Sequence, residues 1–539
     1  MRYYFAESVP LPLKRKGHSL TMRIGIDVGG TNTDAVLMDG DAVAATVKRT
    51  TTADVTSGIV AALANLREQR GFGSGDIDAV MIGTTHFINA LIEAERLVPT
   101  AAVRLGLPAT ASLPPFVDWP GSLRQAMRGR AYLAHGGHEF DGREISSLDA
   151  EELKRYAADM ADHGIRSVAI SSVFSPINSE MELAAQEILA AELGSDVAFS
   201  LSHEIGRIGL LERENATIIN AALRELAATI ADGLASSVTS SGLAAPLFLS
   251  QNDGTLMDVE YARRYPVATF ASGPTNSMRG AAVLSGLQNC AVVDVGGTTT
   301  DVGVLSQGFP REASGVVSVS GVRTNFRMPD VLSIGIGGGS LIRDEGLGVG
   351  PDSVGYRLSS EALVFGGPTL TATDIMVAAG WAEIGDPSLV AHLPKDLVRR
   401  ALDVIAARVT DTVERTRTSA SPLPVVAVGG GSVLLGDQLP GLGQVHKPEN
   451  FAVANAIGAA IAQVSGEIDK VYALSEGRRA AVIDEARQEA VDRAIAAGAD
   501  PATVEIVDFD EVPIPYLPGN ATRVRAKAVG DLDLKAAAR

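Results

Sequence analysis

Residues 292–305 read VVDVGGTTTDVGVL, and this stretch decides how the rest of the chain is interpreted. A near copy, IGIDVGGTNTDAVL, occupies residues 24–37. Both stretches consist of an apolar run, an Asp-Val-Gly-Gly turn, three small polar residues, an Asp and a second apolar run. Two copies of one element in separate halves of the chain indicate a duplicated structural unit.

Each copy predicts a strand, a tight turn and a second strand. The apolar runs are short and rich in β-branched residues, as buried strands are. The Gly-Gly pair permits positive φ and lets a backbone approach a ligand closely. Because the apolar pattern resumes directly after the turn, the unit differs from dinucleotide-binding and P-loop motifs, in which a helix follows the turn.

The two turns predict a phosphate-binding site. Backbone N–H groups and small polar side chains form a concave set of donors that suits phosphate oxygens. Asp27 and Asp294 lie at the strand ends beside these donors and are candidates to hold Mg²⁺ directly or through its waters. The alternative is a pair of Gly-rich hairpins without a ligand, and the duplication favours the ligand. We expect phosphate contacts from Gly29, Gly30, Thr31, Asn32, Thr33, Gly296, Gly297, Thr298, Thr299 and Thr300.

The composition is that of a globular protein with several domains. The chain has 539 residues, of which 46% are hydrophobic and 20% are charged. Its net charge of −18 argues against nucleic acid as a partner, because phosphate-backbone binding requires clustered Lys and Arg. The single cysteine, Cys290, excludes a disulfide framework or a Cys-built metal site within one chain and suits a reducing cytoplasm.

The N-terminal residues 1–21 are mixed in character and contain Pro10 and Pro12, so they lack the continuous apolar segment of a signal peptide. No apolar run in the sequence reaches the length of a membrane span. We therefore expect a cytoplasmic protein without membrane contact, in which residues 1–21 are a flexible extension and Met22 is an alternative start.

Strand and helix patterns alternate along the chain, which indicates an α/β protein. The clearest predicted strands are residues 42–49, 77–82, 168–173, 246–250 and 424–428. The clearest predicted helices are residues 56–67, 148–163, 178–193, 210–234, 278–284 and 455–464, together with one that begins near Thr371 or Thr373 as its cap.

Two polar clusters have alternative interpretations. Residues 83–85 leave a predicted strand and enter a helix on which His86 and Asn89 share a face. Thr84, His86 and Asn89 could face a substrate, or Thr84 could cap the helix while His86 packs in the core. The HGGHE stretch at residues 135–139 could bind a metal or form a surface loop.

Further Gly-rich turns follow apolar runs in the second half of the chain. Gly337, Gly338 and Gly339 imply close approach to a ligand or to another backbone. The GGGS turn of Gly429, Gly430, Gly431 and Ser432 would let an adenosine lie against the backbone. Beyond it, a helix over residues 478–497 and strands over residues 504–507 and 523–529 predict a subdomain appended to the nucleotide lobes.

The order of these motifs resembles the superfamily of actin, heat-shock chaperone ATPases and sugar kinases. More narrowly, it resembles the ATP-using A-subunit type of the hydantoinase/oxoprolinase family, from about residue 23 to about residue 466. This resemblance implies a two-lobed α/β fold with lobes over residues 22–200 and 201–468 and a small C-terminal subdomain over residues 469–539. The matching stretches are GIDVGGT (25–31), GTT (83–85), NAL (89–91), SHEI (202–205), SGP (272–274), DVGGT (294–298), GGGS (337–340) and TD (373–374).

The resemblance also implies an activity. It implies ATP-dependent opening of a cyclic amide such as a hydantoin or 5-oxoproline, with ATP and Mg²⁺ bound between the lobes, whereas related members couple ATP to carboxylation of acetone. A-type chains work with a B-type subunit, so we expect a partner subunit, and a homodimer stays open. The chain departs from the family at residues 275–277, TNS, where a small Gly-rich stretch is usual, and it shows no B-type region.

We hypothesise that ATP transfers its γ-phosphoryl group to the amide oxygen and that water then attacks the amide carbon. A small-molecule kinase on the same fold is one alternative. A nucleotide-switched scaffold without a small-molecule substrate is the other.

Overall fold

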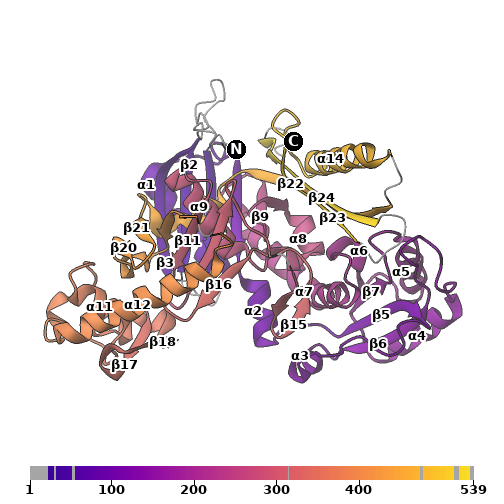
Figure 1. Ribbon diagram of the computed structural model, residues 1–539, viewed down its shortest axis with the longest axis horizontal. Helices are drawn as coiled ribbons and strands as arrows, with labels where there is room; N and C mark the ends of the chain where they lie inside the picture. The colour runs from indigo at the N-terminus through magenta and orange to yellow at the C-terminus, as the bar shows by residue number, and fades with distance from the viewer. Residues whose placement is uncertain are drawn as a thin grey trace, which may run out of the picture.

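The computed structural model describes residues 22–29, 32–50, 55–313, 315–419, 421–473, 477–514 and 521–534. The expected extension over residues 1–21 and two of the expected phosphate contacts, Gly30 and Thr31, lie outside these residues. Figure 1 shows a central body flanked by two lower lobes and by a C-terminal β-structure at its upper right.

The first hairpin belongs to a sheet of nine strands within the described residues. Strands β1 (Met22–Val28), β2 (Asn32–Asp39) and β3 (Ala42–Thr50) form an antiparallel meander, and β4 (Ala79–Thr84) lies parallel to β1. Helix α1 (Val55–Arg70) packs its apolar side on the meander. In spatial order the strands are β23 (Glu505–Pro513), β24 (Ala521–Asp531), β22 (Gln463–Ala473), β10 (Leu256–Asp258), β9 (Leu247–Ser250), β4 (Ala79–Thr84), β1 (Met22–Val28), β2 (Asn32–Asp39) and β3 (Ala42–Thr50).

The second hairpin belongs to a separate sheet. Strands β11 (Cys290–Val295) and β12 (Thr300–Ser306) are antiparallel, and β19 (Val425–Val428) lies parallel to β11. Helix α12 (Lys395–Thr416) covers this sheet through the apolar side chains that it buries. In spatial order the strands are β13 (Phe309–Pro310), β12 (Thr300–Ser306), β11 (Cys290–Val295), β19 (Val425–Val428), β21 (Gly443–His446) and β20 (Gln438–Leu439), with β16 (Val331–Ile334) also paired to β12.

The two hairpins have matching registers, which confirms the predicted strand–turn–strand duplication. Asp27 is paired with Asp34 across the first hairpin, and Asp294 is paired with Asp301 across the second. The parallel neighbour places Gly83 beside Asp27 and Val428, the residue before Gly429, beside Asp294. The duplication in sequence is therefore a duplication in three dimensions.

Two short helices, α9 (Ser272–Ser285) and α13 (Ala454–Ala459), cross between the two sheets. They cross at glycines: a Cβ on Gly280 would lie 1.9 Å from the Ala454 carbonyl oxygen, and a Cβ on Gly458 would lie 1.8 Å from the Asn276 carbonyl oxygen. Helix α9 begins six residues earlier than predicted, because Ser272 and Gly273 already belong to its first turn. The close crossing brings side chains of both helices to the hairpin ends.

A third sheet forms the lower lobe at the right of Figure 1. Its four parallel strands lie in the order β6, β5, β7, β8, and the long helix α7 (Leu210–Ser240) packs on it. The strands are β5 (Thr100–Leu107), β6 (Arg130–His135), β7 (Ser167–Ser172) and β8 (Ala198–Leu201), and the nearby helices are α3 (Gly121–Ala126), α4 (Ala150–Asp162), α5 (Glu180–Leu193) and α6 (Ser202–Ile205). Helices α2 (His86–Glu93) and α8 (Val259–Arg264) contact α7, and α8 also contacts β9 and β10 of the first sheet. The predicted boundary between residues 200 and 201 falls inside β8.

The lobe at the left of Figure 1 follows the second hairpin in sequence. Its helix α11 (Ala372–Ala378) begins at Thr371, one of the two predicted caps, and Asp374 completes a capping box. This lobe also contains β17 (Ser340–Arg343), β18 (Gly348–Ser353) and α10 (Leu358–Glu361), whereas β14 (Val317–Val319) and β15 (Val322–Thr324) form a separate two-stranded sheet that packs against α7. The 3₁₀ turns of the described chain, in sequence order and not confined to this lobe, are Pro266–Thr269, Asp344–Gly346, Gly355–Arg357, Leu363–Phe365, Pro387–Leu389, Ser432–Leu434 and Phe451–Val453.

The sequence predicted that the C-terminal elements form a subdomain appended to the nucleotide lobes. In the structure their strands continue the first sheet. Strand β22 pairs with β10, so β22, β24 and β23 extend the first sheet, and α14 (Arg479–Ala496) packs on them. The predicted boundary after residue 468 falls inside β22. Residues 515–520, between β23 and β24 in the sequence, lie outside the described residues.

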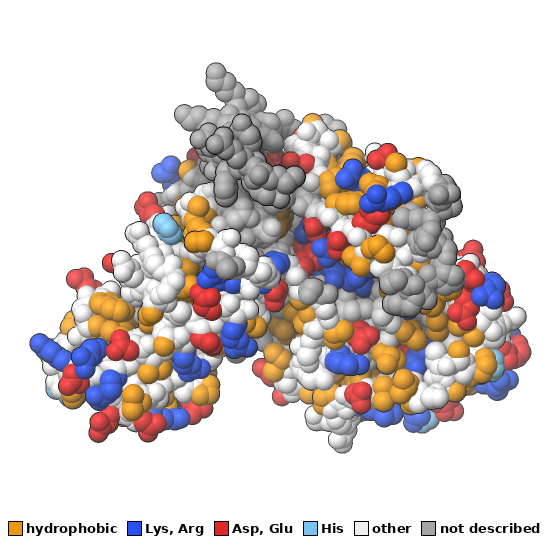
Figure 2. All heavy atoms as spheres, in the orientation of Figure 1, with side chains coloured by type: hydrophobic (Ala, Val, Ile, Leu, Met, Phe, Trp, Pro, Cys, Tyr) orange, Lys and Arg blue, Asp and Glu red, His pale blue; other side chains and the backbone are white. Residues whose placement is uncertain are grey.

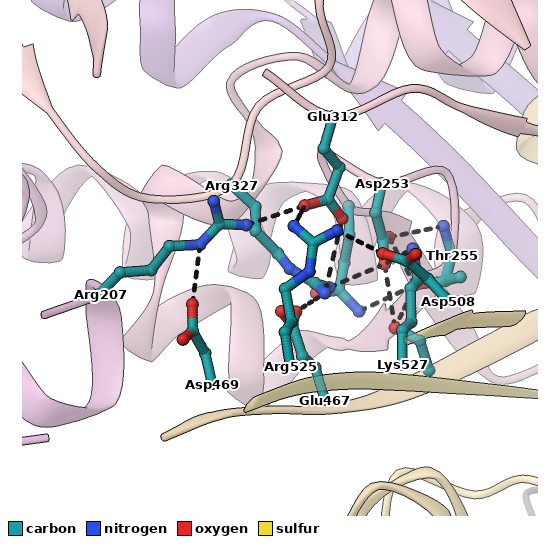
Figure 3. A network of polar contacts seen from close by, with 12 residues as sticks. Arg207, Asp253, Thr255, Glu312, Arg327, Glu467, Asp469, Asp508, Arg525 and Lys527 are labelled. Atoms are coloured by element: carbon teal, nitrogen blue, oxygen red, sulfur yellow. Dashed lines mark hydrogen bonds and ion pairs between the residues drawn. The ribbon is translucent and has the colours of Figure 1, made fainter. Parts of the chain in front are cut away.

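A network of charged side chains joins these C-terminal strands to the other lobes (Figure 3). Lys527 donates to Asp253 at 2.8 Å, and both side chains are almost fully buried. Arg525 and Arg207 pair with Glu312 at 3.1 and 2.8 Å, and Arg207 also approaches Asp469. Figure 2 shows acidic and basic side chains interspersed over the same face of the molecule, with both signs gathered near its centre.

Candidate functional site

The end of β1 carries a carboxylate that is held by amide groups from both crossing helices. Asp27 is buried, with 5% of its surface exposed. Asn455 of α13 donates from Nδ2 to Asp27 Oδ2 at 3.0 Å and to Asp34 Oδ2 at 2.9 Å. Asn276 of α9 donates from Nδ2 to Asp27 Oδ1 at 3.3 Å. The two carboxylates of the first hairpin are therefore tied to the second half of the chain.

The second hairpin repeats this arrangement with a hydroxyl in place of an amide. Ser277 of α9 hydrogen-bonds to Asp294. Ser277 lies three residues before Gly280, and Asn455 lies three residues before Gly458, so the two donors occupy equivalent positions on the crossing helices. Each strand-end aspartate thus meets a polar side chain from the helix that crosses above it.

Burial makes these carboxyls costly to ionise. It raises the pKa of Asp27 to about 7, with the nearby Asp34 adding to the rise and the amides of Asn276 and Asn455 opposing it. Burial also raises the pKa of Asp294, against the opposing effects of Ser277 and Lys48. The pKa of Asp301 rises to about 6 for the same reason. A bound cation would favour the ionised form of all three groups.

The turns of the two hairpins are built alike. Gly29 donates its backbone N–H to the Asn32 carbonyl at 3.0 Å, and Gly296 donates to the Thr299 carbonyl at 2.9 Å. Thr298 and Thr299 are exposed, so their hydroxyl groups are open to a ligand. The hydroxyl of Thr300 instead donates to the Ile336 carbonyl at 2.7 Å, and the Thr33 side chain is buried.

The predicted Gly-rich contacts at residues 337–339 lie against another backbone. Gly338 and Gly339 donate their N–H groups to the carbonyls of Gly296 and Gly297 at 3.0 and 2.7 Å. A Cβ on Gly337 would lie 2.6 Å from the Thr298 nitrogen. Of the two roles that the sequence left open, close approach to a backbone is therefore observed, and these glycines position the second turn.

The GGGS turn lies beside the end of β11. A Cβ on Gly429 would lie 2.2 Å from Asp294 Oδ1, and a Cβ on Gly431 would lie 2.7 Å from the Gly296 carbonyl oxygen. Gly430 faces Lys48, and Ser432 is fully buried. The glycines are required because the turn and the hairpin touch. Adenosine binding at this turn stays a prediction.

Thr84, His86 and Asn89 lie where two helices begin. The Thr84 hydroxyl is 2.5 Å from His86 Nδ1, and Asn89 Nδ2 donates to the Thr85 hydroxyl at 3.4 Å. The hydroxyl of Ser272, at the start of α9, donates to the Thr84 carbonyl at 3.1 Å. The N-termini of α2 and α9 therefore lie side by side near Asp27, where their N–H groups favour negative charge.

The residues around Asp27 fit Mg²⁺. Asn276, whose Nδ2 donates to Asp27, has a buried Oδ1 without a hydrogen-bond partner among the described residues. Carboxylate and amide oxygens are the ligands that Mg²⁺ prefers, and in nucleotide sites it keeps several waters and uses one or two carboxylates. No group of three or more His, Cys, Asp or Glu side chains placed to hold a metal occurs in the described parts of the chain, including residues 135–141.

Sequence reasoning missed Asp34, Lys48, Asn276, Ser277 and Asn455. Asp34 stands inside the quoted hairpin motif, and Asn276 and Ser277 stand in the TNS stretch that departs from the family pattern. Lys48 and Asn455 carry no local signal, because their contacts depend on pairing between distant segments.

None of the helices in the described ranges combines the length and the apolar character needed to cross a lipid bilayer.

Comparison with known proteins identifies related chains. Caprolactamase subunit alpha of Pseudomonas jessenii is 27% identical over 476 residues, which cover 81% of this chain and 65% of that protein. The gamma subunit of acetophenone carboxylase from Aromatoleum aromaticum is 25% identical over 397 residues, which cover 66% of this chain and 53% of that protein. The chain thus spans less than two thirds of the length of either relative.

The crystal structure of ATP-dependent caprolactamase from Pseudomonas jessenii shares the fold, with a TM-score of 0.76 at 20% identity over 94% of this chain and 87% of that one. This match and the duplicated hairpins confirm the predicted two-lobed α/β fold. Residues 23–193 match the hydantoinase/oxoprolinase N-terminal region, and residues 213–419 match the hydantoinase/oxoprolinase sequence pattern. The chain therefore belongs to the hydantoinase/oxoprolinase family.

Proposed function

We propose that the chain binds ATP with Mg²⁺ between its two hairpins and uses it to activate the oxygen of a cyclic amide. The observation that carries this proposal is the pair of equivalent turns, each with a strand-end aspartate, buried at Asp27 and partly buried at Asp294, that is held by a side chain from a crossing helix. Family membership supports it, as does the relation to an ATP-dependent caprolactamase.

The reaction begins with attack of the amide oxygen on the γ-phosphorus, which releases ADP and leaves a phosphorylated imidate. Water then attacks the amide carbon, the ring C–N bond breaks, and a second water releases phosphate. ATP, the lactam and two water molecules thus give ADP, phosphate and the ring-opened amino acid. Positioning and charge stabilisation are the main contributions that a protein makes to the first step.

Named side chains have distinct roles in this scheme. The exposed hydroxyls of Thr298 and Thr299 and the turn N–H groups bind phosphate oxygens. Asp27 and Asp294 would hold Mg²⁺, directly or through water, and the ion would supply positive charge against the phosphates. Thr84, His86 and Asn89 face the substrate. The adjoining N-termini of α2 and α9 stabilise negative charge that develops nearby.

A partner subunit is part of the proposal, because the relatives are named as subunits alpha and gamma. The partner would supply the groups that complete ring opening. The relation to acetophenone carboxylase supports carboxylation as a second candidate, in which the same nucleotide site would serve a ketone substrate.

The test combines two measurements. The first is phosphate release from Mg-ATP in the presence of hydantoin, of 5-oxoproline, of caprolactam, or of acetophenone plus bicarbonate. The second is the unfolding temperature with and without Mg-ATP. Binding at about 100 times the dissociation constant stabilises a protein by about 2.7 kcal/mol. We expect Mg-ATP to raise the unfolding temperature of the wild type and not that of Asp294→Ala. The compound that stimulates phosphate release identifies the reaction class. Stabilisation without stimulation indicates a required partner, and absence of stabilisation refutes the nucleotide site.

A further inference from the structure

Lys48 lies outside both hairpin motifs, on β3, yet its side chain ends at Asp34 of the first hairpin. Its Nζ donates to both oxygens of Asp34, at 2.7 and 2.8 Å. The same ammonium group donates to the Ala452 carbonyl at 3.2 Å, just before α13. Lys48 thus connects the first sheet to the segment that carries Asn455.

Lys48 also faces the second hairpin. A Cβ on Gly430 would lie 3.6 Å from Lys48 Cε and 3.9 Å from its Nζ. The positive charge of Lys48 lowers the pKa of Asp294, against the effect of burial. One ammonium group therefore acts on a carboxylate of each hairpin and lies beside the GGGS turn.

The Lys48 side chain is 37% exposed, whereas Asp34 is buried. A phosphate oxygen can replace the Ala452 carbonyl, which is the longest of the three contacts, while both contacts to Asp34 remain. The phosphates of ATP would meet Asp27, Asp34, Asp294 and Asp301, and these like charges repel each other strongly away from bulk water. A basic group at this place offsets that repulsion together with Mg²⁺.

We propose that Lys48 is a phosphate-binding residue of the nucleotide site and contacts the terminal phosphates of ATP. This inference rests on the proposed nucleotide function. It assigns to Lys48 a contact with the reacting group rather than a purely structural ion pair with Asp34.

Lys470 is a matched control for this assignment. It also pairs with two oxygens of one carboxylate, Glu489, at 2.8 and 2.7 Å, and it is 38% exposed. Its partner lies on α14, on the C-terminal sheet extension. Lys48→Met and Lys470→Met therefore each remove a half-exposed ammonium group that pairs with both oxygens of one carboxylate, and only Lys48 lies beside the proposed nucleotide site.

The experiment measures dissociation constants of Mg-ATP, Mg-ADP and adenosine by calorimetry for wild type, Lys48→Met, Lys48→Arg and Lys470→Met. We expect Lys48→Met to weaken Mg-ATP binding at least tenfold and to leave adenosine binding unchanged. Lys48→Arg should recover part of the loss, because it keeps the charge. Lys470→Met should bind all three ligands as the wild type does.

A folded Lys48→Met protein that binds Mg-ATP as the wild type does would overturn the assignment. Equal loss of ATP and adenosine affinity would also overturn it, since that pattern indicates a structural role. If Lys48→Met does not fold, the double variant Asp34→Asn/Lys48→Met removes both charges of the pair and should still lose ATP affinity. A wild type that binds no nucleotide would refute the proposed function itself, and with it this inference.

Discussion

At the scale of single residues, the site depends on amide groups that hold buried carboxylates. Asn455 uses one NH₂ group to bridge Asp27 and Asp34, and Asn276 donates to the other carboxylate oxygen of Asp27. A buried carboxylate without such donors would carry an uncompensated desolvation cost. These amides therefore favour the ionised form of the buried carboxylates, which is the form that binds a cation.

Asn455→Ala removes the bridge between Asp27 and Asp34. We expect a loss of about 1.5–3 kcal/mol in the free energy of unfolding, the range for hydrogen bonds to charged groups. Because both carboxylates then repel with fewer donors, the pKa of Asp27 should rise further above its value of about 7. Urea unfolding at neutral pH measures the loss. Gln125→Ala, at an exposed position on α3, should stay within about 0.5 kcal/mol of the wild type, and equal stability of the two variants would contradict the role of Asn455.

At the scale of elements, the site is assembled by the crossing of α9 and α13. The two helices meet through Gly280 and Gly458, each against a carbonyl of the other helix segment. This close approach sets the distance between the hairpins and delivers Asn276, Ser277 and Asn455 to them. A wider crossing would separate these side chains from the aspartates.

Gly458→Ala should therefore be strongly destabilising. Its Cβ would lie 1.8 Å from the Asn276 carbonyl oxygen, so the backbones must separate. We expect a cost of about 3 kcal/mol, the upper part of the range for overpacked sites. Gly121→Ala is the control, because a Cβ on Gly121 meets nothing within 4 Å and Ala is the better helix former. Denaturant midpoints compare the two, and a mild effect of Gly458→Ala would show that the crossing can relax.

At the scale of the whole molecule, charged side chains connect the C-terminal strands to the rest of the chain. Glu312 lies among Arg207, Arg327 and Arg525, which lower its pKa to about 2 against the opposing effect of burial. Arg327 also pairs with Glu467 on β22. Since the strands of the C-terminal segment extend the first sheet, this network stabilises the arrangement of distant parts of the sequence.

The low pKa of Glu312 predicts acid sensitivity. The folded pKa lies below the unfolded value of about 4.3, so the stabilisation is complete above about pH 5 and is lost as the pH falls toward about 2. Glu312→Gln should have lower stability than the wild type at neutral pH and a shallower loss of unfolding temperature between about pH 5 and pH 3. Parallel thermal scans across this range measure both effects. Identical slopes in the two proteins would show that Glu312 is not a source of the acid sensitivity.

The amino-acid sequence by itself determined the duplicated hairpins and the α/β class. These features depend on local patterns: a short apolar run, a Gly-Gly turn and a resumed apolar run specify a hairpin wherever they occur. The cap at Thr371 was also predictable, since a capping box involves residues three apart. The family resemblance rested on the same local motifs in their order.

Tertiary structure alone decided which residues surround the aspartates and where the C-terminal strands lie. Asn455 is 428 positions from Asp27, and Lys48 reaches a carbonyl 404 positions away. No local pattern encodes such contacts, because strand pairing and helix crossing fix them only when the sheets assemble. The pairing of β22 with β10 is of the same kind, and it joined a predicted separate subdomain to the first sheet. The glycines at residues 337–339 likewise lie against the backbone of the second hairpin turn, and no local pattern in the sequence indicates that contact.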